Sequence, residues 1–149
     1  MSAAQEMAAL FRRDLGRLRA EVEAFGDGAK LWAVLPGVTN SAGNLALHLE
    51  GNLREFIGRQ LGGIPYTRVR PLEFSAKDLT VADLAARLAS LEAAIPPVVA
   101  ELTEEALAAT YPEVVLGEPM PTRQFLFHLY GHLNYHRGQI NYLRRILSH

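Results

Sequence analysis

Two histidines near the end of the sequence have a spacing that could hold a metal ion. His132 and His136 are four residues apart, so on a helix they project from the same face, about 6 Å apart along its axis. His48 lies among leucines on another predicted helix, which points it toward the core. Three neutral imidazoles suit zinc, nickel, copper or ferrous iron and leave coordination positions open. We therefore expect His48, His132 and His136 to hold one divalent metal ion.

His128 extends the row formed by His132 and His136, one step of four residues earlier. Three ligands from one helix would be spread over about 12 Å, too far for one ion, so at most two of the row bind the same metal. His128 is then a ligand, a supporting group or a structural residue. A ligating histidine usually donates its second ring N–H to a polar partner. Asn52, Arg137 and Gln139 are candidates for that role or for contact with a substrate.

A cluster of four arginines surrounds the second predicted helix and the segment after it: Arg54, Arg59, Arg68 and Arg70. They form either a solvated face or a site that recognises a carboxylate or an anionic thiol cofactor at a cavity mouth. Glu50 and Glu55, in the same region, are expected to be surface carboxylates. No phosphate-binding glycine loop and no Ser-His-Asp order is apparent in the sequence.

Apolar residues recur at three- and four-residue steps in four stretches, which predicts four long helices. They cover approximately residues 3–25, 40–61, 80–95 and 123–147. Pro96-Pro97 is expected to kink or stop the third helix, with a further helical piece to about Leu102. Four helices joined by loops of unequal length predict an all-α four-helix bundle, with one domain over residues 1–149.

The links between these helices are also informative. The segments 64–74 and 109–121 are long and irregular, and loops of that length often lie at a site or an interface. Residues 113–116 could form a short extended piece, and Thr122 is the expected N-cap of the last helix. His149, at the end of the sequence, is expected to be solvated.

The composition excludes several classes of site. The 149 residues include no cysteine, which excludes disulfides, thiolate metal ligands and a cysteine nucleophile. The net charge of -1 does not favour nucleic acid or an anionic membrane as a partner. No apolar run approaches the roughly 20 residues of a membrane span, and no signal peptide is recognisable. We therefore expect a cytoplasmic protein.

Two segments resemble one known family. Residues 40–53, which follow Leu31-Trp32, and residues 131–140 are similar to the DinB-like (DinB/YfiT) superfamily, above all in the closing pattern H-x-x-x-H-R-G-Q. The resemblance implies an up-down-down-up four-helix bundle, a homodimer and a three-histidine metal site. Carried over to this sequence, the ligands would be His48, His132 and His136, with His128 in a supporting role.

The resemblance implies less about the reaction. Some relatives are metal-dependent transferases that use low-molecular-weight thiols such as bacillithiol, mycothiol or glutathione, one branch isomerises maleylpyruvate, and many have no assigned reaction. We expect a zinc or nickel ion and a metal-dependent thiol S-transferase that joins a small thiol to an electrophile. The alternatives are a metal-dependent hydrolase and a non-catalytic bundle that is stabilised by metal or binds a small ligand.

Overall fold

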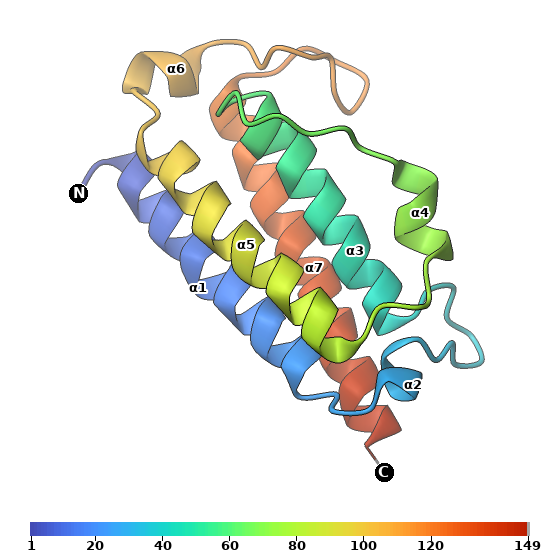
Figure 1. Cartoon of the computed structure of the whole chain (residues 1–149). Coiled ribbons are helices and arrows are strands. Elements are labelled where there is room, and N and C mark those ends of the chain that lie inside the picture. The colour runs from blue at the N-terminus through green and yellow to red at the C-terminus, as the bar shows by residue number, and fades with distance from the viewer. Residues whose placement is uncertain (149) are drawn as a thin grey trace.

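The computed structural model describes residues 1–148, so His149 lies outside the described residues. Four long helical segments form a bundle (Figure 1): α1 (Ala3–Glu23), α3 (Ala42–Leu53) with its continuation η1 (Arg54–Arg59), α5 (Val81–Ala100) and α7 (Thr122–Leu147). α1 and α7 run in one direction, and α3 and α5 run in the opposite one (Figure 1). This confirms the predicted all-α bundle and its up-down-down-up topology.

Three short helices join the long ones: α2 (Gly28–Leu31), α4 (Arg70–Ser75) and α6 (Glu104–Ala108). The helix α4 lies within the segment expected to be an irregular loop, and it packs against α3. Within residues 1–148, extended structure is limited to two isolated bridges, one of which joins Val115 to Glu118. None of the described helices is both long enough and apolar enough to cross a membrane.

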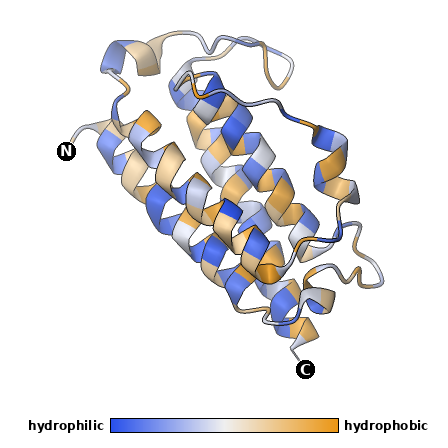
Figure 2. Ribbon diagram, in the orientation of Figure 1, coloured by the Kyte–Doolittle hydropathy of each residue, from blue (hydrophilic) through white to orange (hydrophobic). Residues whose placement is uncertain are grey.

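The core lies between the four long helices. Hydrophobic and hydrophilic residues both occur along each of them (Figure 2), as amphipathic helices require. Phe11, Leu15, Leu18 and Val22 form the buried stripe of α1. The helix α3 differs because all its residues are buried, including Asn44, His48, Glu50 and Asn52. It packs against α1, α5 and α7, and α4 covers it further. Its polar side chains therefore need partners inside the protein.

One expectation about a helix end holds and one was wrong. Pro96-Pro97 does not stop the third helix: α5 continues to Ala100, close to the helical end expected near Leu102, and the N–H of Glu101 still bonds to the carbonyl of Pro97. Thr122 is the first residue of α7 rather than its cap, which is Pro121. The widened turn η1 was not predicted either, and its hydrogen bonds run over five residues, as from Gln60 to Glu55.

A buried carboxylate joins α1 to α7. The side chain of Asp14 is fully buried and accepts hydrogen bonds from Arg13, the hydroxyl of Tyr130 and the amide of Asn134. Burial alone would raise the pKa of Asp14, but these donors outweigh it and lower that pKa to about 2. The ionised form of Asp14 therefore stabilises the folded protein.

This carboxylate should make stability depend on pH in acid. Since the pKa of Asp14 is lower in the folded state, its contribution is complete above pH 4 and is lost as the pH falls toward 2. The shift from 3.8 to about 2 corresponds to about 2 kcal/mol of unfolding free energy. We expect Asp14→Asn to remove this part of the acid dependence, measured by denaturant unfolding from pH 5 to pH 2. Asp78→Asn, at an exposed position, is the matched control, and identical pH profiles for all three proteins would contradict the assignment.

Candidate metal centre

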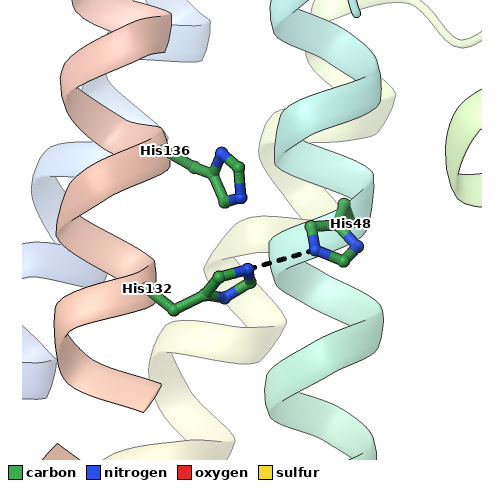
Figure 3. A group of neighbouring side chains, drawn as sticks. All are labelled: His48, His132 and His136. Atoms are coloured by element: carbon green, nitrogen blue, oxygen red, sulfur yellow. Dashed lines mark hydrogen bonds between the residues drawn. The ribbon is translucent and has the colours of Figure 1, made fainter. Parts of the chain in front are cut away.

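Three histidine side chains meet between α3 and α7 (Figure 3). His48 comes from α3, and His132 and His136 come from α7. One ring nitrogen of each lies within 4.8 Å of the other two, and the Nε2 atoms of His48 and His132 are 3.2 Å apart. Two nitrogens bound to one tetrahedral zinc ion are roughly 3.3 Å apart. The cluster could therefore hold a metal ion with small side-chain adjustments.

Hydrogen bonds on the outer side of two rings set their orientation. The Nδ1 atom of His48 lies 3.0 Å from a carboxylate oxygen of Glu73, and Nδ1 of His136 lies 2.7 Å from the amide oxygen of Gln139. Because both partners are acceptors, each Nδ1 carries the hydrogen, and each Nε2 has a lone pair, which in His48 lies 3.2 Å from Nε2 of His132. Imidazoles that bind metals usually have such partners.

Glu73, which orients His48, is itself held in place. Its buried carboxylate accepts two hydrogen bonds from the guanidinium of Arg68, at 2.8 and 2.9 Å. The side-chain amide of Asn44 donates to the backbone carbonyls of Glu73 and Ala76, which fixes α4 against α3. Arg68, Glu73 and His48 thus form a chain of contacts that leads from the 64–74 segment to the histidine cluster.

Gly51 leaves the space that the Glu73 carboxylate occupies. A Cβ atom at this position would overlap one carboxylate oxygen and lie 2.7 Å from the Cδ atom of Glu73. It would also lie 3.3 Å from Nε of Arg68. The close approach of the ion pair to α3 therefore depends on a residue without a side chain.

The electrostatics of the cluster favour neutral rings. Burial, followed by the nearby His136 and His48, lowers the pKa of His132 to about 4. Burial also lowers the pKa of His48, although Glu73 opposes this shift. Both rings are therefore unprotonated at neutral pH, as metal binding requires. The Nδ1 atom of His132 is buried without a hydrogen-bond partner in the described residues. This donor set fits a divalent ion of borderline softness.

The comparisons with known proteins agree with this fold. The family model described as the DinB superfamily matches residues 4–140. The chain belongs to the DinB superfamily. Among solved structures, it resembles the crystal structure of a DinB-like protein from Bacillus cereus, with a TM-score of 0.67 and 19% sequence identity. The match covers 91% of this chain and 86% of that one. No curated protein matches the chain.

The other residues singled out from the sequence have different positions in this DinB protein. The exposed ring of His128 stacks on Phe125 and lies 6.3 Å from the ring of His132, outside the cluster. Arg137 donates to Asn134 and has no hydrogen bond to the three histidines. Gln139 contacts His136. Asn52 is buried, and its side-chain oxygen has no partner among the described residues.

The sequence did not indicate the partner of His48. Glu73 lies 25 residues from His48 in a segment without periodicity, and no pattern relates the two. The expectation for Glu50 was wrong: it is buried and bonds to Arg54 and Arg87. It is buried because α5 packs against α3.

Two cavities border the cluster. The first, of about 490 Å³, is lined by His48 and His132 together with side chains from α3, α4, α7 and the 113–116 turn. The second, of about 500 Å³, is lined by His136 and Gln139 and by apolar groups that include Tyr142 and Ile146. Small molecules can therefore reach the histidines without unfolding of the bundle.

We expect Gly51→Ala to destabilise the protein by about 1–3 kcal/mol, because the added methyl group displaces the buried Glu73 carboxylate. The unfolding free energy in denaturant measures the effect. Gly131→Ala, in α7, is the matched control: a Cβ there meets open space, and the change should stabilise the helix by up to about 1 kcal/mol. Equal effects of the two substitutions would show that Gly51 is not needed for the position of Glu73.

Proposed function

We propose that this protein is a metal-dependent transferase that joins a low-molecular-weight thiol to an electrophile. The observation that carries the proposal is the meeting of three histidine side chains beside a cavity large enough for a small thiol. The chain has no cysteine, so the reacting thiol must come from a co-substrate. Bound to three histidines, a zinc or nickel ion supplies Lewis acidity that lowers the pKa of a thiol and provides a thiolate at neutral pH.

The protein's own residues prepare this site. Glu73 and Gln139 direct the lone pairs of His48 and His136 toward a common point. Burial keeps His48 and His132 neutral, so protons do not compete with a metal ion at pH 7. The cavity beside His48 and His132 gives a thiol access to that point. The pair Arg68–Glu73 stabilises the His48 ring rather than binding substrate.

The ligand assignment predicts different effects for two neighbouring histidines of α7. We expect His132→Ala to abolish stoichiometric binding of zinc or nickel, because it removes a nitrogen 3.2 Å from that of His48. His128→Ala should retain most of the metal, since its exposed ring lies outside the cluster. Elemental analysis of protein purified without a nickel column measures both. Equal metal loss in the two variants would show that the ligand set is wrong.

The thiol assignment is tested with cobalt in place of the native metal. We expect glutathione, bacillithiol or mycothiol to produce a sulfur-to-cobalt charge-transfer band and to shift the visible absorption of the Co²⁺-loaded protein. The same titration of metal-free protein is the control. Unchanged spectra with all three thiols would exclude the transferase function. If metal then raised the melting temperature strongly and thiols had no effect, the ion would have a structural role.

A further inference from the structure

Leu116 has a backbone conformation that leucine rarely adopts. Its φ angle is 54°, and among residues 1–148 it is the one residue other than glycine with a positive φ. Gly117 follows with a φ of 85°, and the N–H of Glu118 bonds to the carbonyl of Val115 across them. Two consecutive positive φ angles are typical of a type I′ turn, which favours Asn-Gly. In this region the Cβ of a leucine crowds the following carbonyl oxygen. The turn would therefore be more stable with asparagine at position 116.

Packing in the core does not explain why position 116 holds a leucine. The side chain of Leu116 is 61% exposed, and that of Val114 is 64% exposed, whereas Val115 between them is buried. Both exposed side chains line the cavity of about 490 Å³ that His48 and His132 border. A strained residue with an exposed apolar side chain at the wall of a cavity indicates contact with a ligand.

The hairpin that carries these side chains, residues 110–121, is fixed at its base. Tyr111 is buried, and its N–H bonds to the carbonyl of Met120. Its hydroxyl donates to the carbonyl of Phe56 in η1. In an α-helix the N–H of Gln60 would bond to that carbonyl, but in this widened turn it bonds to Glu55 instead. The hairpin is thus attached to the helical segment that supplies Phe56 to the cavity, which holds its tip at the cavity wall.

The same cavity has further apolar side chains from α7 and η1: Phe56, Phe125 and Leu129. The rings of Phe56 and Phe125 are in edge-to-face contact, with their centroids 5.2 Å apart. Arg70 and Glu113 also line the cavity and offer contacts to polar parts of a substrate. The side chains of Val114 and Leu116 offer carbon atoms alone, so the tip of the hairpin fits a hydrophobic group.

We propose that Val114 and Leu116 bind a hydrophobic alkyl group of the electrophile and so determine which electrophiles this protein accepts. The inference rests on the proposed function, because the bound molecule is taken to be the partner of the thiol at the histidine cluster. Binding removes the two side chains from water, and the gain increases with the apolar area that is buried. Asparagine at position 116 would give a more stable turn but a weaker contact.

Unreactive alcohols test this contact without any reaction. Butan-1-ol, pentan-1-ol and hexan-1-ol share one polar group and differ by one methylene at each step. They are titrated into zinc-loaded protein with labelled leucine and valine methyl groups, and NMR gives the dissociation constants and the signals that shift. The variants are Leu116→Asn and Val114→Thr. The matched control is Val34→Asn, because Val34 is 52% exposed and does not line the cavity.

We expect the affinity of the unaltered protein to rise about two- to fourfold with each methylene, and the methyl signals of Val114 and Leu116 to shift. Leu116→Asn should weaken hexan-1-ol binding by about three- to tenfold and raise the melting temperature by about 2–4 °C. Val114→Thr should weaken binding by about two- to fivefold without raising the melting temperature. Val34→Asn should change neither quantity.

Several results would overturn the assignment. If Leu116→Asn raises the melting temperature and leaves affinity unchanged, the leucine does not contact the ligand. If the melting temperature does not rise, the fold itself requires the leucine. Equal affinities for the three alcohols would exclude a hydrophobic site. If sedimentation shows that Leu116→Asn dissociates an oligomer, the tip is an interface between copies of the chain.

The cobalt titration with thiols distinguishes failure of this inference from failure of the proposed function. A thiol-responsive spectrum in a protein whose hairpin tip binds no alcohol would leave the transferase function in place and exclude the hydrophobic contact. An unresponsive spectrum with the expected alcohol binding would exclude both the transferase function and the electrophile as the ligand, and would support the hydrophobic contact alone.

Discussion

The ion pair between Arg68 and Glu73 is the interaction on which the histidine cluster depends. Glu73 is buried, and a buried carboxylate is unfavourable unless its charge is paired and its oxygens accept hydrogen bonds. Two guanidinium hydrogen bonds and one from the His48 ring meet that need. His48 therefore has one favoured tautomer and one ring orientation. The direction of the Nε2 lone pair of His48 therefore follows from its contact with Glu73, which lies in α4, outside the four long helices.

The arrangement also explains why α3 is buried on all sides. The helix α4 must lie against α3 for Glu73 to reach His48, and Asn44 fixes it there by bonding to two of its backbone carbonyls. The same packing buries the His48 ring, and burial lowers the pKa values of His48 and His132. Rings that hydrogen bonds already orient, such as those of His48 and His136, would need little reorganisation to bind an ion.

The sequence predicted those parts of the structure that depend on local spacing. Periodicity placed the long helices, and the four-residue step placed His132 and His136 on one face of α7. The sequence could not predict Glu73 as the partner of His48, because that contact depends on how an aperiodic segment folds back over α3. Glu50 was expected at the surface because local spacing does not show that other helices cover α3 on every side. A helix that is buried all round has no separate polar face in its sequence pattern.

The arginines of the predicted cluster at residues 54–70 differ in whether they form an ion pair with a carboxylate. Arg54, Arg59 and Arg68 each neutralise a carboxylate of the same chain, so their geometry is fixed by the fold. A charge already engaged in this way gains little from a ligand, since binding would first have to break the existing hydrogen bonds. Among residues 1–148, Arg70 pairs with no carboxylate and contacts the ring of Phe74. Where several like charges surround a site, the capacity to recognise an anion therefore lies with the one that the fold leaves unpaired.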